Sequence, residues 1–368
     1  MGLRKMLKNV LIIDDSALMR RVLSGIIDKD KRLKVVDIAR NGSMALSLIE
    51  ANPKKYDIIL LDFFMPDMNG DVLLQKISNI SLDAEIILIS GIIKEDAMEV
   101  IHALENGVFD FVTKPNDFSQ AKGEDFSAKL LERIELAANA LDEKRQRART
   151  MNTPKRGERS SIINKSKEIK QKGVVRGEKI VALACSTGGP KALHQLVPKL
   201  PANLDAPMVI VQHMPKGFTN SLAERLDEMS EIRVKEAEDG EMLNKGTVYI
   251  AKGGLQLRIM ENKGQHVIKL TEEPARNGLR PCADIMYESL VESRFAEIVC
   301  VVLTGMGGDG TAGIKQLNTK NNIYSIAQNA ETCTVYGMPK VFFESGLVDE
   351  VLPIQDIAGA IGKHVGVR

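Results

Sequence analysis

Carboxylate, hydroxyl and ammonium side chains follow a series of short apolar runs in the first third of the chain. Asp14 and Asp15 come directly after NVLII, Asp62 ends DIILLD, Ser90 ends EIILIS, and Lys114 follows FDFVT. Clustered carboxylates attract a hard cation such as Mg²⁺, and one of them can act as a nucleophile toward a phosphoryl donor. The hydroxyl and the ammonium would offset the phosphoryl charge. These residue types predict a phosphoacceptor site.

A second group of reactive side chains lies in the second half of the chain. Ser186 follows IVALAC and precedes a Gly-rich turn, His213 ends APMVIVQH, and Asp309 lies in VVLTGMGGDG. A serine nucleophile needs a base, usually histidine, and a carboxylate that orients the base. Judged on its local pattern alone, Ser186-Thr187 is more typical of a helix cap. The three residues together favour a Ser-His-Asp hydrolase.

Two other motifs are possible in the same region. The nucleophile-elbow pattern G-x-S-x-G is not met, because Ala184 stands at its first glycine position. Residues 305–310 match G-x-G-x-x-G, but the following strand ends in Gln328 where a ribose-binding acid is expected. A dinucleotide site is therefore rejected.

Alternating strands and helices are expected to position both groups. Residues 9–115 alternate apolar runs with amphipathic segments, and a second alternation begins at Lys179. This pattern is typical of parallel sheets covered on both faces. The carboxyl ends of parallel strands share one edge, where functional groups gather. We therefore expect each half to be an α/β domain with its reactive residues on one rim.

Residues 126–147 have helical spacing without Gly or Pro, so they predict a helix that leaves the first domain. Residues 144–179 contain 13 Lys and Arg against three Glu, with scattered Gly and Pro. This composition is typical of a linker. Binding of nucleic acid by the basic run is the alternative, and the lack of interleaved aromatic residues disfavours it.

The bulk composition limits the possible classes of function. The 368 residues suggest two domains, and a net charge of +1 gives no reason to expect nucleic acid or a membrane surface as partner. The four cysteines are widely spaced, which argues against a disulfide framework or a structural zinc site. Neither a signal peptide nor a membrane-spanning run is evident. We expect a cytoplasmic protein that is not inserted into the membrane.

The first half resembles a response-regulator receiver domain. The run DFFMPDMNG at 62–70 matches the phosphoacceptor loop of that family, and Phe111 stands at its aromatic switch position. The resemblance implies a flavodoxin-like, doubly wound parallel sheet, and phosphorylation of Asp62 by a chemotaxis histidine kinase. It also implies Mg²⁺ bound by Asp15, Asp62 and the Phe64 carbonyl, with Asp14 assisting. We assign residues 7–125 to this domain and 126–178 to the helix and basic linker.

The second half resembles the catalytic domain of chemotaxis-type protein-glutamate methylesterases, and we assign it residues 179–368. The matching runs are CSTGGP (185–190), QHMPKGFT (212–219), LRPCAD (279–284), LTGMGGDG (303–310) and ETCTVYGMPK (331–340). The resemblance implies a doubly wound, mostly parallel fold, and hydrolysis of glutamyl methyl esters on methyl-accepting chemotaxis receptors. Deamidation of receptor glutamines and control by phosphorylation are also implied, with no cofactor for ester hydrolysis.

Further site residues are expected by position. The regions of Thr187 and Met306 are candidates for the oxyanion donors, and Arg280 and Lys252 for contacts with acidic flanks of the substrate. Lys252 and Gln256 depart from the Pro and His that the family commonly has, which predicts an altered substrate groove. Two rival functions stay open at this point: a catalytically silent scaffold that moves on phosphorylation, and a hydrolase of a protein outside chemotaxis.

Overall fold

The computed structural model describes residues 7–91, 97–115, 124–151 and 176–367. It divides into two compact units, Met1–Arg156 and Gly157–Arg368. Most of the basic stretch predicted to be a linker lies outside the described residues. Within the described ranges, no helix is both long and apolar enough to cross a bilayer.

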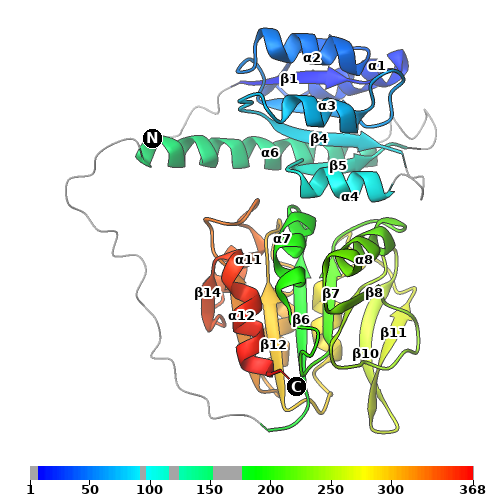
Figure 1. The fold of residues 1–368 in the computed structure, drawn as a ribbon, viewed down its shortest axis with the longest axis vertical. Helices are drawn as coiled ribbons and strands as arrows, with labels where there is room; N and C mark the ends of the chain where they lie inside the picture. The colour runs from blue at the N-terminus through cyan, green and yellow to red at the C-terminus, as the bar shows by residue number, and fades with distance from the viewer. Residues whose placement is uncertain (1–6, 92–96, 116–123, 152–175, 368) are drawn as a thin grey trace. The chain divides into compact units, whose positions relative to one another are not determined.

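The first unit is a five-stranded parallel sheet with helices between its strands (Figure 1). Its elements are β1 (Lys8–Ile13), α1 (Ala17–Ile27), β2 (Leu33–Ala39), α2 (Gly42–Ala51), β3 (Ile58–Asp62), α3 (Gly70–Ile77), β4 (Glu85–Ser90), α4 (Ala97–Glu105), β5 (Asp110–Thr113) and α6 (Glu124–Met151). The strand order is β2-β1-β3-β4-β5. The order reverses between β1 and β3, which is where such sheets open a crevice at the carboxyl ends.

Local sequence signals fix where these helices begin. Ser16, Asn41 and Asn69 are the N-caps of α1, α2 and α3, and each side chain accepts a hydrogen bond from the backbone N–H three residues later. Such caps satisfy N–H groups that the helix itself leaves unpaired. Strands β1, β3 and β4 are mostly apolar and buried, since helices cover both faces of the sheet, whereas the edge strands β2 and β5 are partly exposed.

Helix α6 packs along the same sheet, against β3, β4 and β5 (Figure 1). Ion pairs also hold its second half to the amino ends of the strands. Arg145 Nη1 lies 2.6 Å from Asp57 Oδ1, and Lys144 Nζ lies 2.8 Å from Glu85 Oε1. Lys8, at the start of β1, contacts Asp142 at 2.5 Å. The described part of this helix is therefore attached to the receiver unit.

The second unit is built on a seven-stranded parallel sheet. Its elements are β6 (Lys179–Cys185), α7 (Gly189–Leu196), η2 (Val197–Lys199), β7 (Met208–Gln212), α8 (Phe218–Met229), β8 (Arg233–Glu236), β9 (Thr247–Ile250), β10 (Gln256–Asn262), β11 (Gln265–Thr271), α9 (Ala283–Ser289), β12 (Glu297–Val302), α10 (Thr311–Leu317), β13 (Ile323–Gln328), α11 (Met338–Glu344), β14 (Glu350–Leu352) and α12 (Ile354–Val365). The order β14-β13-β12-β6-β7-β9-β8 reverses between β12 and β6.

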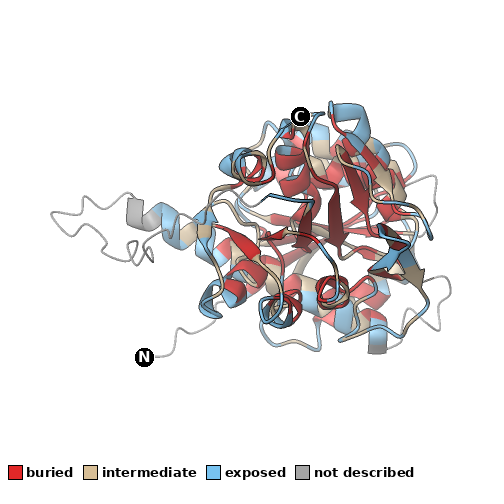
Figure 2. Cartoon of the chain, turned by 90° about the horizontal axis from the view of Figure 1, so that it is seen from below, coloured by how far each residue is buried: buried red, intermediate tan, exposed pale blue. Residues whose placement is uncertain are grey.

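Two layers of helices enclose this sheet. Helix α12 packs against α7 and α8 packs against β8 and β9, whereas α10 packs against both α9 and α11. The central strands β7 and β12 are buried along their whole length, and β6 is buried except at its first residue, Lys179, so the middle of the sheet is the core of this unit (Figure 2). Strands β10 and β11 form a separate antiparallel hairpin that packs on α9. The expected fold, a receiver followed by a doubly wound, mostly parallel α/β domain, is confirmed.

Candidate active sites

The acidic residues of the first unit converge at the carboxyl ends of β1 and β3. Carboxylate oxygens of Asp14, Asp15 and Asp62 all lie within 4.8 Å of one another. Lys114, which follows β5, places Nζ 2.9 Å from Asp14 Oδ2 and 2.6 Å from Asp62 Oδ2. Asp14 and Asp62 are buried, while Asp15 is exposed. The fold thus brings together four side chains from three separate parts of the sequence.

Burial and mutual repulsion act on the charges of this cluster. Burial raises the pKa of Asp62 to about 6, with a contribution from the charges of Asp14 and Asp15 and an opposing one from Lys114. Burial would lower the pKa of Lys114, but Asp62 and Asp14 outweigh it and raise the pKa above its ordinary value. The ammonium therefore stays charged and offsets part of the carboxylate repulsion.

The remaining predicted receiver residues lie on the neighbouring strands and loop. Ser90 is buried at the end of β4, where its hydroxyl donates to the Gly91 carbonyl at 3.3 Å and its own carbonyl accepts from the Lys114 N–H at 2.6 Å. Phe111 lies half-buried in β5. The Phe64 N–H faces Asp62 Oδ1 at 3.4 Å, so this loop folds back over the carboxylate.

In the second unit, Ser186 and His213 leave two neighbouring strands side by side. Cys185 of β6 is in register with Gln212 of β7, and the His213 N–H donates to the Cys185 carbonyl at 3.1 Å. The Gln212 amide donates to the carbonyls of Ser186 at 3.1 Å and of His213 at 3.2 Å. This buried amide joins the two strand ends.

Asp309 follows β12, on the other side of β6, and reaches His213. The His213 Nε2 to Asp309 Oδ2 distance is 2.8 Å. Asp309 also accepts hydrogen bonds from the N–H groups of Ala283 at 2.7 Å and Asp284 at 3.0 Å. Burial by itself would raise the pKa of Asp309, but the bonds from His213 and these amides hold the pKa well below its usual range. Asp309 is therefore a carboxylate at neutral pH.

The turn after β6 is tight, and Ser186 lies at its start. The Gly189 N–H donates to the Ser186 carbonyl at 2.7 Å, and Gly188 is the N-cap of α7 in a left-handed conformation, with φ of 75°. No side chain caps α7, so the helix-cap alternative for Ser186-Thr187 is wrong. The described contacts include the His213–Asp309 bond but no hydrogen bond between Ser186 Oγ and His213.

A glycine-rich loop closes over the serine from the β12 side. A Cβ on Gly305 would lie 2.7 Å from Ser186 Cβ, which places the backbone of Gly305 and Met306 next to Ser186. Thr187 is buried, and its carbonyl accepts from Thr304 Oγ1 at 2.9 Å. Both regions predicted to supply oxyanion donors thus flank Ser186.

The predicted substrate contacts differ in their surroundings. Arg280 is exposed on the loop before α9, and its carbonyl accepts from the Gly254 N–H at 3.0 Å. Lys252 lies 3.0 Å from Glu236 Oε2. Gln256 is fully buried, accepts from the Cys282 N–H at 2.8 Å and donates to the Leu279 carbonyl at 3.1 Å. Of the two cations, Lys252 is paired with Glu236, whereas Arg280 is exposed and takes part in none of the described ion pairs.

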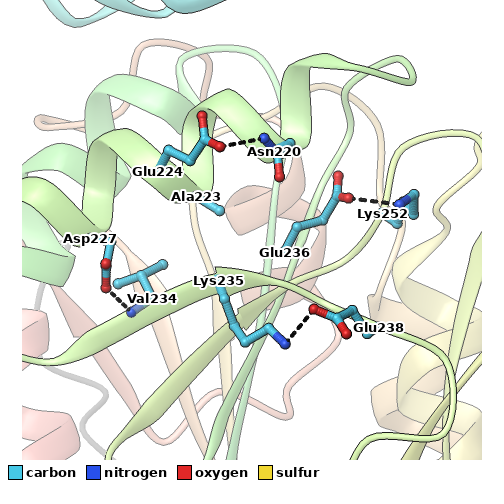
Figure 3. A pocket seen from close by; sticks show the side chains of 9 residues that line it. All are labelled: Asn220, Ala223, Glu224, Asp227, Val234, Lys235, Glu236, Glu238 and Lys252. Atoms are coloured by element: carbon cyan, nitrogen blue, oxygen red, sulfur yellow. Dashed lines mark hydrogen bonds and ion pairs between the residues drawn. The ribbon is translucent and has the colours of Figure 1, made fainter.

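A polar pocket of about 400 Å³ lies between α8 and β8 and includes Lys252 (Figure 3). Within it Glu236 points toward Lys252, and Lys235 pairs with Glu238. Its lining contains none of Ser186, His213 and Asp309. It is therefore separate from the reactive group.

Sequence reasoning missed several polar residues that support the reactive group. They are Gln212, Cys282 and Asp284, and all three are buried; Gln256, which the sequence indicated only as a change in the substrate groove, is buried as well. The Cys282 thiol lies 3.1 Å from Asp309 Oδ1, and burial together with the charge of Asp309 raises the Cys282 pKa to about 12. The available signal was a polar residue ending an apolar strand, as Gln212 ends β7.

Comparison with known proteins matches the two units to two families. Residues 181–361 match the CheB methylesterase family, and residues 10–123 match the response regulator receiver domain family. The crystal structure of the Thermotoga maritima CheB methylesterase catalytic domain is 43% identical in sequence, covers 51% of this chain and 99% of that chain, and has a TM-score of 0.49.

Similar full-length relatives carry one shared name. A protein-glutamate methylesterase/protein-glutamine glutaminase of Bacillus subtilis is 40% identical over 97% of this chain and 98% of the relative. The protein of the same name from Geobacillus kaustophilus is 40% identical over the same shares. With a receiver-type acidic cluster in one unit and a His-Asp pair beside a serine in the other, this chain belongs to the protein-glutamate methylesterase/protein-glutamine glutaminase family.

Proposed function

We propose that this protein hydrolyses γ-glutamyl methyl esters on chemotaxis receptors, and deamidates receptor glutamines, by a Ser-His-Asp mechanism. The observation that carries the proposal is the 2.8 Å contact between His213 Nε2 and Asp309, on the strand-end rim that also holds Ser186. The names of the full-length relatives support the choice of substrate. The exposed Arg280 is proposed to meet an acidic flank of the receptor helix.

In the proposed reaction, His213 accepts the proton of Ser186 through Nδ1, because Nε2 is engaged by Asp309. Ser186 Oγ then attacks the ester carbonyl, and the C–O bond to methanol breaks as His213 returns the proton to the leaving oxygen. Water hydrolyses the acyl-enzyme with the same proton relay. Asp309, ionised throughout, orients the ring and stabilises its charged form.

The backbone N–H groups at Thr187 and Met306 are proposed as oxyanion donors. Both segments flank Ser186, and Gly305 lets the second approach it closely. Donors fixed by the fold stabilise the charge on the oxyanion without reorganising during the reaction. A glutamine side chain follows the same route, with ammonia leaving in place of methanol.

We further propose that Asp62 accepts a phosphoryl group from a chemotaxis histidine kinase. Three carboxylates that include the exposed Asp15 fit a hydrated Mg²⁺, which prefers a few carboxylate ligands and keeps several waters. Asp14, Asp15, Asp62 and the Phe64 carbonyl would hold the ion, which supplies charge neutralisation at the phosphoryl oxygens when bound. Ser90 and Lys114 are placed to contact the phosphoryl group, and Phe111 to respond to it.

Phosphorylation is proposed to raise esterase activity by shifting the receiver between two states. The assigned boundaries, 7–125 for the receiver, 126–178 for the connection and 179–368 for the hydrolase, and a cytoplasmic location belong to this proposal. The catalytic strand-end geometry disfavours a nucleic-acid-binding output. A substrate outside chemotaxis is the second candidate that the assay must test.

The test is methanol release from methylated chemoreceptor membranes in the presence of Mg²⁺ and a small phosphodonor. Ser186→Ala should lower the rate by roughly 10⁴-fold, since the nucleophile is lost. Ser230→Ala, a serine at the end of α8, is the matched control and should release methanol at the wild-type rate. Absence of release from the wild type would reject receptor esters as the substrate, and release by Ser186→Ala would reject the nucleophile.

A further inference from the structure

A second buried carboxylate, Asp284, lies beside Asp309 and has no part in the proposed reaction. Asp284 is the second residue of α9, and Asp309 stands just before α10. Only 7% of Asp284 and 9% of Asp309 are exposed to solvent. Two buried carboxylates repel each other, so their pairing calls for a specific compensation.

Each carboxylate accepts hydrogen bonds from the backbone of the segment that carries the other aspartate. Asp309 accepts from the N–H groups of Ala283 and Asp284 at 2.7 and 3.0 Å, at the start of α9. Asp284 Oδ1 accepts from the N–H groups of Gly310 and Gly313 at 2.9 and 2.7 Å, at the start of α10. Each aspartate therefore compensates unpaired N–H groups at the helix to which the other belongs.

The fit around Asp284 leaves little freedom for the loop that carries Asp309. A Cβ on Gly313 would lie 2.7 Å from the Asp284 carbonyl oxygen, and Gly310 has a φ of 92°. The two helices therefore approach closely only through these glycines. Shifting the carboxylate of Asp284 would release Gly310, which directly follows Asp309.

Gln256 fixes the other side of the same segment. Its side-chain oxygen accepts from the Cys282 N–H at 2.8 Å, and its amide donates to the Leu279 and Pro274 carbonyls at 3.1 and 3.2 Å. The start of α9 is thus anchored independently of Asp309. Asp284 then holds the loop before α10 against this anchored segment, through its bonds to Gly310 and Gly313.

We propose that Asp284 is a positioning residue for the hydrolase, holding Asp309 in line with His213 through Gly310 and Gly313. This inference rests on the proposed Ser-His-Asp mechanism. What matters is an acceptor oxygen at the position of Asp284 Oδ1, rather than the negative charge of the side chain. The role is distinct from that of Asp309, which contacts the histidine itself.

Metal binding is the alternative use of this cluster, because ligand atoms of Cys282, Asp284 and Asp309 lie within 4.8 Å of one another. The hydrogen bonds disfavour it. Both oxygens of Asp309 and Oδ1 of Asp284 already face N–H groups, whose positive ends repel a cation. The cluster is arranged to accept hydrogen bonds.

The experiment measures kcat and KM for methanol release by the full chain with three substitutions. Asp284→Asn keeps the acceptor oxygen without the charge, and we expect a kcat within about threefold of the wild type. Asp284→Glu keeps the charge but moves the oxygens, and Asp284→Ala removes them. Both should lower kcat by roughly 10- to 100-fold, as misplacement of a reacting group does, with KM within about twofold.

Asp227→Ala is the matched control, because Asp227 Oδ1 also accepts a backbone bond, from the Val234 N–H at 2.6 Å, away from the reactive group. It should lose stability but keep kcat. A folded Asp284→Asn with the low kcat of Asp284→Ala, or an active Asp284→Glu, would overturn the proposal. The wild type and Ser186→Ala are measured in the same assay. An inactive wild type, or an active Ser186→Ala, would mean that the proposed function itself is wrong, whereas the outcomes above would reject only the role of Asp284.

Discussion

At the scale of the residue, Gly305 makes room for Ser186 because it lacks a side chain. A Cβ at this position would lie 2.4 Å from Met338 Sδ, 2.7 Å from Ser186 Cβ and 3.1 Å from Ser186 N. Real side chains do not tolerate such distances, and Met338 is fully buried, so the serine would have to move. The position of Ser186 therefore depends on the absence of a side chain at a neighbouring strand end.

Gly305→Ala should therefore lower kcat for methanol release by roughly 10- to 100-fold and destabilise the catalytic unit by about 1–3 kcal/mol. Gly359→Ala in α12 is the control, because no atom lies within 4 Å of its added Cβ. That variant should keep its activity and gain up to about 1 kcal/mol of stability, since alanine favours a helix. Wild-type kcat in Gly305→Ala would show that the contact relaxes without moving Ser186.

The acidic cluster of the receiver predicts a pH dependence of metal binding. Mg²⁺ competes with the proton on Asp62, whose pKa is raised to about 6 by burial. Affinity should be nearly constant above pH 7 and about tenfold weaker at pH 5, because the protonated form then predominates. Isothermal titration calorimetry from pH 5 to 8 measures this change. Equal affinities at pH 5 and 7.5 would contradict it.

The raised pKa of Asp62 has a matching effect on folding in the absence of metal. A carboxyl group with a folded pKa above its unfolded value binds more protons when folded, so its contribution to stability falls as the pH rises from about 4 to 6. Asp62→Asn removes this contribution. Adding Mg²⁺ should raise the free energy of unfolding of the wild type and have little effect on that of Asp62→Asn.

Residue types and strand-end positions were enough to predict which candidate side chains lie on the same rim of each sheet. Ser186, His213 and Asp309 follow three buried parallel strands, and that rule places their side chains on one rim. The supporting bonds of Gln212, Gln256 and Asp284 could not be predicted in this way. Apart from the Gln212 bond to the adjacent His213 carbonyl, they join side chains to backbone groups between 18 and 29 positions away in the sequence, as for Gln256 with Pro274 and Asp284 with Gly313.

At the scale of elements, the missed strands share one property. Strands β2, β8, β10 and β14 were not identified from the sequence, and each forms an edge of its sheet. Edge strands carry a mixture of buried and exposed residues, as in the pattern of Leu33–Ala39, so they lack the continuous apolar run of a central strand. Their identity depends on the neighbouring strand with which each pairs.

Helix α6 extends the receiver beyond its expected end. Arg145 binds Asp57 at 2.6 Å and Asp83 at 2.8 Å, and 24% of its side chain is exposed. Asp57 also accepts from the Asn9 N–H at 2.8 Å, so Arg145 joins α6 to a carboxylate that fixes β1. The basic composition that predicts a linker therefore begins within α6, a helix that packs on the sheet of the first unit.

Arg145→Met should therefore destabilise the receiver unit by about 1–2 kcal/mol, since it leaves the half-buried Asp57 without its cation. Arg147→Met is the control on the same helix, because its partner Glu143 is exposed and 3.7 Å away. Hydrogen exchange of the full-length protein should show faster exchange in the second half of α6 for the first variant alone. Equal exchange in both variants would mean that apolar packing is sufficient to hold α6.

At the scale of the whole molecule, the two sheets share one feature of their strand order but position different sets of reactive residues. Each strand order reverses next to the first strand of its unit, between β3 and β1 in one and between β12 and β6 in the other. The acidic cluster and the His-Asp pair both lie at the carboxyl ends next to these reversals. Connecting the two chemistries requires the receiver to alter access to the hydrolase or its geometry.

The comparison of full-length protein with residues 176–368 tests this connection. If the receiver restrains the hydrolase, the fragment should release methanol at a rate independent of phosphodonor, and the full-length protein should reach that rate only with phosphodonor and Mg²⁺. Asp62→Ala should stay at the low rate under all conditions. Equal rates for full-length protein with and without phosphodonor would reject the inhibition.

In the proposed mechanism, the order of the strands also selects the tautomer of His213. His213 leaves β7, Ser186 leaves the adjacent β6, and Asp309 leaves β12 on the far side of β6. Neighbouring strands lie about 4.8 Å apart, so the serine needs the ring nitrogen nearer the backbone and the aspartate needs the farther one. The neutral ring therefore carries its proton on Nε2, where it binds Asp309. This is the reverse of the protease triad, in which the aspartate binds Nδ1. Strand order, more than any single side chain, sets the direction in which the imidazole passes its proton.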